Sequence, residues 1–554
     1  MTRCRTLPEA LSDAAATGLG YTFVSGGAET VRSYADIRTA ALGVASSLLE
    51  CGLRRGDLVG LIISDPEEFL TALFGASIAG LTPASLYPPA TIGDLPRYIE
   101  LTAATLRSSG ARAVVTSAAL VHALDAVRSS CPALDMVLSR RELDAPPVEP
   151  LTSPSLDDIA FVQFTSGSTS APKGVALTHR SLSANIEAFG GPSGVGAGPS
   201  DVAVSWLPLN HDMGLVGMAL GALYTPCACV LMQPEAFVRR PTEWLRAITR
   251  HRGTISFAPN FAYDLCVRRV KQLEGLDLSS WRVTGCGAEP IHPPTLAAFA
   301  TKFAAVGFRN TSFLPCYGLA EHVLAASFPP RDRAIRTELV SADALAGRRI
   351  AVSGTARDSV MLVSCGRPLP GHAIDVVGDD GRTVPERHVG EIVLSGPSVM
   401  LGYYKQDELT SQVLRNGRLR TGDLGYLSDG ELFVCGRAKD LIIVNGRKYH
   451  PQDLEWAVDD LAGIRRGRVV AFGAPERGRP DRVVIVAEPS GTVAAPSLTE
   501  MIRRRIGDLF GLYVDDVALV NHGAVGRTTS GKVQRGATKA RYESGELALE
   551  SLRA

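Results

Sequence analysis

The stretch FTSGSTSAPKG, at residues 164–174, places hydroxyl side chains and glycines directly before a lysine. It follows the apolar run IAFVQF, which predicts a buried strand, and α/β proteins bind ligands where strands end. Glycine backbone N–H groups and Ser/Thr hydroxyls could surround an anion, and Lys173 would add a point charge. The stretch is not a Walker A loop, because Gly174 rather than Ser or Thr follows Lys173. Taken alone, it indicates either a phosphate loop or a flexible surface loop.

Four further stretches carry residues suited to nucleotide chemistry: FLPCYGLAEH (313–322), RTGDLGYL (420–427), GRAKDLIIVNGRKYHP (436–451) and GRTTSGKVQR (526–535). Together with the first stretch, and in this order, they resemble the motifs of the adenylate-forming superfamily. That superfamily contains acyl-CoA synthetases, adenylation domains of peptide synthetases and luciferases. The resemblance covers nearly the whole chain, and it implies an enzyme that uses ATP and Mg²⁺ to convert a carboxylate into an acyl adenylate.

A narrower resemblance, to the fatty acyl-AMP ligase branch, rests on SWLPLNHDMGLVG (205–217), APNFAYDLCVRR (258–269) and DLSSWRVTGCGAEPI (277–291). Members of this branch carry an extra segment after the YGLAE motif, and here Glu321 and Gly366 are 45 positions apart. We therefore expect a ligase-type insertion at about 330–365. The branch passes the acyl group to the phosphopantetheine of an acyl carrier protein, with little or no use of free coenzyme A.

The expected reaction needs groups that neutralise negative charge, since a carboxylate must attack the α-phosphate of ATP in line. The resemblance implies a grip on the β- and γ-phosphates by Thr165, Ser166, Gly167, Ser168, Thr169 and Lys173. Glu321 is the expected Mg²⁺ ligand, together with Thr165, because a hard cation prefers oxygen donors. Lys532, on a glycine-bearing loop, is the expected catalytic residue at the α-phosphate, while Lys173 holds the departing pyrophosphate.

The same resemblance places the nucleoside between two walls. The residues expected around adenine are Tyr317, Gly318, Gly287, Ala288 and Glu289. Asp423 would accept hydrogen bonds from both ribose hydroxyls, and Arg437 would reach ribose or phosphate. Judged without the resemblance, Tyr317 could be a core tyrosine, Asp423 a turn residue and Glu321 a solvated glutamate at a helix start.

Lys439, in GRAKD, is the expected hinge about which a C-terminal domain rotates between half-reactions, although a solvated loop lysine would look the same. His211, in NHDMG, is a catalytic candidate that resembles the residue guarding the acyl pocket. A general-base role is disfavoured, because a carboxylate is already ionised at neutral pH. Met218 and Phe261 could line the acyl tunnel, but core packing is the preferred explanation of both.

Helical and strand-like patterns alternate from residue 35 to about 330, which predicts an α/β fold with largely parallel sheets. Short strands joined by Gly and Asp turns follow from about 360, as in a small β-rich subdomain. The last part mixes strands and helices, so we expect a small mobile α+β domain. The predicted organisation is an adenylation domain at 1–436, a hinge at 437–440 and a C-terminal domain at 441–554.

The composition narrows the class of protein. The chain has 554 residues, too many for one core, and its 57 basic and 57 acidic residues disfavour a nucleic-acid partner. Ten scattered cysteines without CxxC pairs predict buried thiols in a reducing compartment rather than a zinc site. The N-terminus lacks a signal-peptide core. The uncharged segment 213–234 contains Gly and Pro, so we predict a buried helix and strand rather than a membrane span, and a cytoplasmic protein.

Several functions fit these motifs. The leading one is a fatty acyl-AMP ligase that loads an acyl carrier protein in trans, since the chain has no carrier-type DSL serine motif. A fatty acyl-CoA synthetase shares the first half-reaction and differs in its thiol acceptor. A luciferase-like oxygenase would oxidise the adenylate, which nothing in the sequence demands. A non-catalytic homologue would be expected to lose Lys532, Glu321 or Asp423, and all three are present.

Overall fold

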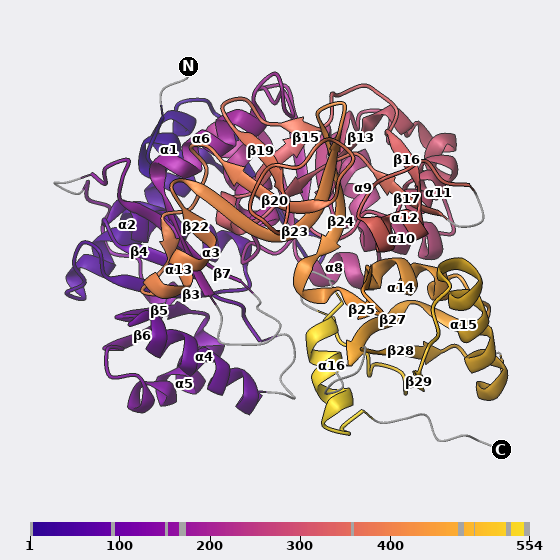
Figure 1. Cartoon of the computed structure of the whole chain (residues 1–554). Helices are drawn as coiled ribbons and strands as arrows, with labels where there is room; N and C mark the ends of the chain where they lie inside the picture. The colour runs from indigo at the N-terminus through magenta and orange to yellow at the C-terminus, as the bar shows by residue number, and fades with distance from the viewer. Residues whose placement is uncertain are drawn as a thin grey trace.

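The fold is seen in a computed structural model that describes residues 4–89, 95–149, 153–165, 173–355, 359–474, 481–491, 493–527 and 533–547. Figure 1 shows a large unit that contains the N-terminus and a smaller unit, at the lower right, that ends the chain. We refer to the described residues up to 436 as the body and to those from 441 to 547 as the C-terminal region.

One sheet of the body has the strand order β13-β12-β11-β9-β10-β1-β2. Neighbouring strands are parallel except in the β1–β2 hairpin. The strands are β1 (Gly20–Ser25), β2 (Ala28–Ser33), β9 (Val202–Ser205), β10 (Ala228–Met232), β11 (Ile255–Ala258), β12 (Val283–Cys286) and β13 (Phe313–Pro315). Strands β11 and β12 are buried along their whole length, as expected for parallel strands covered on both faces.

A second sheet has the strand order β21-β8-β7-β4-β3-β5-β6. Here β8 is antiparallel to both of its neighbours, and the other pairs are parallel. The strands are β3 (Leu58–Ile62), β4 (Thr82–Ser85), β5 (Ala113–Thr116), β6 (Met136–Ser139), β7 (Ile159–Thr165), β8 (Lys173–Thr178) and β21 (Gly402–Tyr403). The run IAFVQF lies in β7, which confirms that the phosphate-loop stretch leaves the end of a strand.

Helices connect the strands of these sheets. Three of them are capped at the N-terminus by reciprocal hydrogen bonds, in which the capping side chains are those of Thr6, Ser33 and Thr178. The helices are α1 (Leu7–Ala15), α2 (Tyr34–Glu50), α3 (Pro66–Ile78), α4 (Leu95–Ser109), α5 (Ala118–Asp125), α6 (His179–Gly190), α7 (Gly221–Tyr224), α8 (Pro234–Arg239), α9 (Thr242–His251), α10 (Asn260–Arg269) and α11 (Pro293–Phe303).

The uncharged segment after residue 212 forms a π-helix at Met213–Leu220, then α7 and then β10. Most of its residues are buried in the body's core. The structure therefore confirms the predicted buried helix followed by a buried strand. Within the described ranges, no helix has both the length and the apolarity that a membrane crossing requires.

The β-rich part of the body consists of small antiparallel sheets. One runs β19-β20-β23-β22, with β24 also paired to β23, and another runs β14-β15-β18. Their elements are β14 (Tyr317–Gly318), β15 (Ala325–Phe328), β18 (Arg367–Pro368), β19 (Ala373–Val377), β20 (Gly390–Ser395), β22 (Leu414–Arg415), β23 (Arg418–Ser428), β24 (Glu431–Arg437) and the helix α13 (Asp407–Val413). The change of pattern expected near residue 360 is therefore confirmed.

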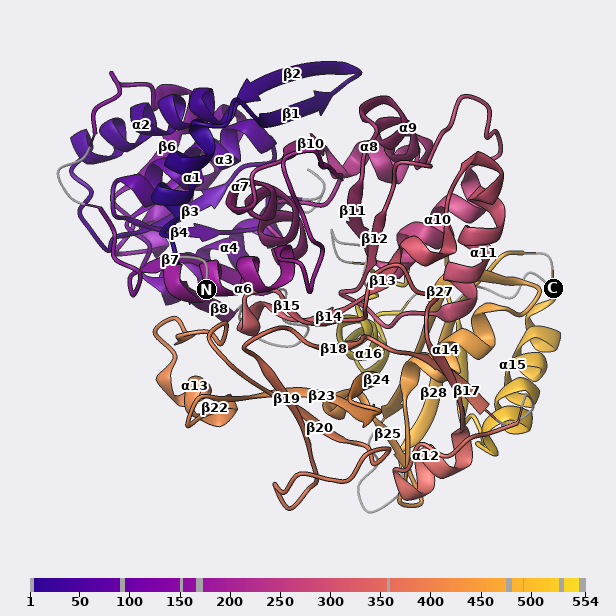
Figure 2. The ribbon, with the colours of Figure 1, turned by 90° about the horizontal axis from the view of Figure 1, so that it is seen from above.

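The C-terminal region combines a sheet of order β27-β28-β29 with a β25–β26 hairpin and flanking helices. Its elements are β25 (Ile442–Val444), β26 (Arg447–Tyr449), β27 (Ile464–Ala474), β28 (Arg482–Pro489), β29 (Asp516–Leu519), α14 (Pro451–Asp459), α15 (Ala495–Phe510) and α16 (Arg535–Glu543). Apolar residues of α14 and α15 form a core with the sheet. Seen from above in Figure 2, this region lies next to α10 and α11 of the body. The α/β fold followed by an α+β region is thus as predicted.

The segment expected to be an insertion forms β16 (Thr337–Ser341), α12 (Ala342–Arg348) and β17 (Ser359–Val363). Strands β16 and β17 pair with each other, and α12 packs against β26 and α15. Ala346 lies in the core of the C-terminal region, and Asp343 forms an ion pair with Arg447. This segment therefore connects the body to the C-terminal region through side-chain contacts.

Candidate active site

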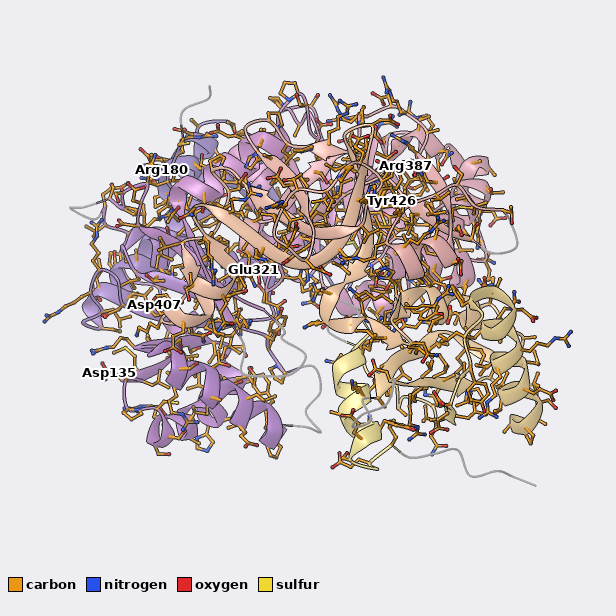
Figure 3. All side chains as sticks on the ribbon, in the orientation of Figure 1. Asp135, Arg180, Glu321, Arg387, Asp407 and Tyr426 are labelled. Atoms are coloured by element: carbon orange, nitrogen blue, oxygen red, sulfur yellow. The ribbon has the colours of Figure 1, made fainter. Side chains whose placement is uncertain are left out.

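A cavity of about 1630 Å³ lies where the body meets the C-terminal region. Figure 3 shows Glu321, one of its lining residues, near the middle of the molecule. The predicted site residues in the lining are Lys173, His211, Phe261, Ala288, Glu289, Tyr317, Gly318, Glu321, Asp423, Arg437 and Lys439. Residues from motifs far apart in the sequence therefore meet around this space.

The two ends of the predicted phosphate loop lie side by side, because Thr165 of β7 is paired with Lys173 of β8. The Lys173 ammonium lies 4.9 Å from the centre of the Tyr403 ring, within range of a cation–π interaction. Four predicted loop residues and the predicted catalytic lysine lie outside the described residues: Ser166, Gly167, Ser168, Thr169 and Lys532. Their roles stay predictions.

Glu321 is held next to Lys173 by Tyr403. The Tyr403 hydroxyl donates to Glu321 Oε1 at 2.9 Å, and the Met400 N–H donates to the Glu321 carbonyl at 2.9 Å. Burial raises the pKa of Tyr403, and the neighbouring Glu321 carboxylate raises it further. The hydroxyl therefore keeps its proton at neutral pH and can donate it to the carboxylate in a hydrogen bond.

The Glu321 carboxylate fits the chemistry of Mg²⁺, since it is an oxygen donor of fixed orientation in the cavity wall. Among the described residues, no group of three or more His, Cys, Asp or Glu side chains could form a metal site by itself. A site with few protein ligands suits an Mg²⁺ ion that takes most of its ligands from phosphates and water.

Asp423 is the centre of a polar cluster in which Asp423 and Tyr317 are buried and the Arg437 side chain is 58% exposed. The Tyr317 hydroxyl donates to Asp423 Oδ2 at 2.8 Å, and Arg437 Nε donates to Oδ1 at 3.1 Å. Strands β23 and β24 place Asp423 directly opposite Arg437. Burial and the Asp423 charge raise the pKa of Tyr317, so its hydroxyl stays protonated. The cluster gives the cavity a carboxylate of defined orientation.

Close backbone approaches explain the small residues expected around adenine. A Cβ added at Gly287 would lie 2.6 Å from Cys316 Sγ, and one at Gly318 would lie 1.7 Å from the Leu324 carbonyl oxygen. Ala288 has a φ of +68°, an uncommon value for a residue with a side chain. The two glycine positions therefore have no room for a side chain, and the contact of all three residues with adenine stays a prediction.

Glu289 and Phe261 contact each other at the start of α10. The Phe261 N–H donates to Glu289 Oε1 at 2.6 Å, where a carboxylate is favourable because it faces unpaired helix N–H groups. The Phe261 ring lies 6.0 Å from Trp206 and 6.5 Å from Phe237. Phe261 therefore joins an aromatic cluster and also lines the cavity, so both interpretations of its sequence pattern apply.

His211 precedes the π-helix, and its Nδ1 lies 2.6 Å from Asp212 Oδ1. Both side chains line the cavity. Met218 does not belong to the described lining: it is 1 % exposed and packs in the core, while Met213 and Gly217 of the same helix line the cavity. Of the two explanations for Met218, the structure supports core packing rather than the acyl tunnel.

The C-terminal region reaches the cavity through several side chains that the sequence analysis did not assign. The Trp456 ring lies 4.8 Å from the His292 ring, and the Arg527 guanidinium lies 5.8 Å from the Phe261 ring. Lys439 is exposed, in a turn at Ala438–Asp440 between the body and this region. Arg527 could have been predicted from its place in the GRTTSGKVQR motif, five residues before Lys532. No local sequence pattern identifies Trp456 or Tyr403 as site residues.

Comparison with protein-family models matches residues 11–404 to the AMP-binding enzymes and residues 439–552 to the AMP domain of Disco-interacting protein 2-like proteins. A Caulobacter vibrioides protein named only as a candidate acyl-CoA synthetase is 38% identical over 98% of this chain and 96% of its own length. The medium-chain-fatty-acid–[acyl-carrier-protein] ligase JamA of Moorena producens is 34% identical over 95% of this chain and 93% of its own length. The long-chain-fatty-acid–AMP ligase FadD26 of Mycobacterium marinum is 34% identical over 96% of this chain and 95% of its own length.

A solved structure from a study of fatty acyl-adenylate ligases of E. coli and L. pneumophila has a TM-score of 0.92 and 36% identity, covering 98% of both chains. The chain therefore belongs to the AMP-binding enzymes of the adenylate-forming superfamily, whose members use ATP. Within that family it is an enzyme of the fatty acyl-AMP ligase type, as the sequence motifs predicted.

Proposed function

We propose that this enzyme activates a fatty acid with ATP, releases pyrophosphate, and transfers the acyl group to the phosphopantetheine thiol of a separate acyl carrier protein. The observation that carries the proposal is the continuity of the cavity, which brings the Asp423 cluster, Glu321 and an apolar wall together. The apolar side chains in this wall are Phe189, Met213, Phe257, Leu324 and Phe328. A nucleotide and an acyl chain can thus lie in contact.

In the first half-reaction, the fatty-acid carboxylate attacks the α-phosphorus and the bond to pyrophosphate breaks. Asp423 accepts hydrogen bonds from the ribose hydroxyls through the oxygen lone pairs that its bonds from Tyr317 and Arg437 do not use. Lys173 neutralises the departing pyrophosphate, and Lys532 neutralises charge at the reacting phosphorus. His211 separates the acyl and nucleotide parts of the cavity.

We assign Mg²⁺ to Glu321, where the ion would offset negative charge on the ATP phosphates. Thr165, the second predicted ligand, ends β7 directly across from Lys173. Glu321→Gln should raise the Mg²⁺ concentration for half-maximal adenylation by about tenfold, because a neutral amide is a weaker ligand. Titrations with magnesium, followed by pyrophosphate release, measure this shift. An unchanged titration curve would show that Glu321 is not a Mg²⁺ ligand.

In the second half-reaction, the C-terminal region turns about residues 437–440, with Lys439 as the hinge, and the carrier thiol attacks the acyl carbonyl. AMP then leaves. The similarity to JamA, which is named an acyl-carrier-protein ligase, supports a carrier as acceptor. The second candidate is a fatty acyl-CoA synthetase, which the Caulobacter relative favours by its name.

A two-stage assay separates these candidates. Fatty acids of graded length are incubated with ATP, and pyrophosphate and acyl adenylate are measured. Coenzyme A and a panel of phosphopantetheinylated carrier proteins are then offered at equal concentrations. We expect acyl transfer to a carrier to be much faster than to coenzyme A. Fast, saturable acyl-CoA formation would select the second candidate, and the absence of acyl adenylate with every carboxylate would reject both.

A further inference from the structure

Two glycines lie directly behind apolar side chains of the cavity wall. A Cβ atom added at Gly217 would lie 3.0 Å from Leu324 Cδ2, and one added at Gly285 would lie 1.9 Å from Phe257 Cδ1. Leu324 and Phe257 both line the cavity, and Gly285 lies opposite Phe257 in the buried strand β12. Each apolar side chain therefore occupies space that a side chain at the neighbouring glycine would need.

Neither glycine is required by its backbone conformation. Gly217 lies inside the π-helix Met213–Leu220 and Gly285 lies inside β12, and neither of them has a positive φ. Because glycine destabilises the interior of a helix or strand relative to alanine, these two elements gain no stability from it. What the glycines do provide is room for the side chains of Leu324 and Phe257.

The backbone around Leu324 is held in place by hydrogen bonds. The Leu324 N–H donates to the His322 carbonyl at 2.8 Å. The Asn185 side chain of α6 binds the next residue twice, because Nδ2 donates to the Ala325 carbonyl at 2.8 Å and Oδ1 accepts from the Ala325 N–H at 3.1 Å. A methyl group at Gly217 would therefore displace the Leu324 side chain rather than its backbone, and the cavity is the space beside that side chain.

Phe257 is confined in a similar way. The Tyr263 hydroxyl donates to the Gly285 carbonyl at 2.6 Å, so the strand behind the Phe257 ring is fixed. The ring centre of Phe328, which also lines the cavity, lies 6.1 Å from that of Phe257. With Gly285 behind it and Phe328 beside it, a Phe257 ring displaced from Gly285 would move into the cavity.

We propose that Gly217 and Gly285 are specificity-determining residues, which keep Leu324 and Phe257 out of the acyl part of the cavity and so set the longest fatty acid that the enzyme activates. The inference rests on the proposed function, since it takes the apolar wall as the acyl site. It deepens that function by assigning the limit on chain length to the packing behind the wall.

The test measures pyrophosphate exchange with fatty acids of graded length in Gly217→Ala. We expect kcat/KM for the longest accepted acid to fall about tenfold relative to the shortest, because the space of one methylene in an apolar pocket changes discrimination by about 10- to 200-fold. The KM for ATP should stay within about twofold. The double variant Gly217→Ala/Leu324→Ala, which removes the displaced side chain, should restore the ratio. This ratio does not depend on the fraction of folded enzyme.

Gly507→Ala is the matched control, because a Cβ added at this glycine of α15 would meet no atom of the described residues within 4 Å. It should leave the ratio unchanged. Phe257→Leu removes atoms from the wall and should raise the ratio about tenfold, which tests the inference even if Gly217→Ala does not fold.

An equal fall for all chain lengths in Gly217→Ala, no recovery in the double variant, or an unchanged ratio in Phe257→Leu would overturn the inference. If the wild-type enzyme forms no acyl adenylate from any fatty acid, the proposed function fails instead, so the two failures are distinguishable.

Discussion

Two buried carboxylates, one in the body and one in the C-terminal region, are held in opposite ways. Asp423 accepts hydrogen bonds from Tyr317 and Arg437 and faces the cavity. Asp453, in the first turn of α14, is equally buried, but its Oδ1 has no hydrogen-bond partner among the described residues. Burial raises the pKa of Asp453 to about 8. The body thus presents an acid oriented by two hydrogen-bond donors, whereas the C-terminal region contains an acid whose raised pKa keeps it mostly neutral at pH 7.

This contrast extends to the neighbours of Asp453. His450 Nδ1 also lacks a hydrogen-bond partner within the described ranges, and burial lowers the pKa of His450 to about 4. Among the described residues, buried polar atoms without a hydrogen-bond partner occur in the body as well, for example Gln163 Oε1 and Asn210 Oδ1, so the contrast concerns these two acids and not the two units as a whole. We propose that the C-terminal region turns during the reaction while the nucleotide wall of the body stays in place.

The largest expected effect comes from removing Lys532, the catalytic lysine predicted for the C-terminal region. Lys532→Ala should slow acyl-adenylate formation by about 10²–10³-fold, because it deletes a charge that stabilises the transition state. ATP binding, measured by calorimetry, should stay within about twofold if the nucleotide wall of the body provides most of the affinity. Arg504→Gln, at a side chain that is 82% exposed, is the control. Adenylation at the wild-type rate would show that another residue performs this role.

The next largest effect concerns Asp423, in the nucleotide wall of the body. Asp423→Asn should reduce kcat/KM for ATP by about thirtyfold, because hydrogen bonds to a charged group are worth roughly 1.5–3 kcal/mol. Steady-state kinetics at graded ATP concentrations measure this loss. Asp429→Asn changes a 78% exposed carboxylate in the same β-hairpin and should leave kcat/KM unchanged. A loss below about threefold for Asp423→Asn would place the ribose elsewhere.

A smaller effect sharpens the difference between the two acids. The pKa of Asp453 is higher in the folded state than in the unfolded chain, so its contribution to stability is complete in acid and is lost as the pH rises through about 8. The wild type should lose about 2 kcal/mol between pH 6 and pH 8, and Asp453→Asn should lose much less. Urea titrations with hydrogen exchange of the C-terminal region measure this. Asp508→Asn, at a 72% exposed carboxylate, should behave like the wild type.

The smallest effect concerns the ring contact between Trp456 of the C-terminal region and His292 of the body. Trp456→Ala should slow adenylation by about two- to tenfold, since an aromatic pair contributes roughly 0.5–1.5 kcal/mol. Trp456→Phe keeps a ring against His292 and should recover most of the rate. Adenylation is measured by pyrophosphate exchange, and transfer is measured from pre-formed acyl adenylate to a phosphopantetheinylated carrier. A loss confined to acyl transfer would mean that the Trp456–His292 contact stabilises the second half-reaction instead.

Local patterns were sufficient to predict most of the fold. The apolar run of β7 and the alternation of helices and strands report burial residue by residue, so their positions follow from the sequence. Motif resemblance predicted Asp423 and Arg437 as separate nucleotide-binding residues, and the structure adds that β23 and β24 pair them with each other. By contrast, the role of Tyr403 depends on the pairing of β21 with β8, which brings together residues that no local pattern relates.

Met218 shows a different limit. The helix was predicted, but Met213 and Gly217, four residues apart on one face, line the cavity, whereas Met218 packs in the core. A hydrophobic segment without a polar face offers no pattern from which the cavity-facing side could be predicted. The partly buried ion pairs of Arg535 with Asp440 and Glu455 were missed for a related reason, since paired charges from distant positions resemble solvated residues in the sequence.

The helix α12 has a consequence for how this enzyme can be taken apart. Ala346 completes the hydrophobic core of the C-terminal region, although it precedes that region in the chain and belongs to the segment between β16 and β17. A fragment that starts at residue 441 would expose the apolar surface that Ala346 covers and would leave Arg447 without Asp343. The packing unit is therefore larger than the stretch of chain after the hinge, and a chimera that exchanges C-terminal regions must carry a matching α12.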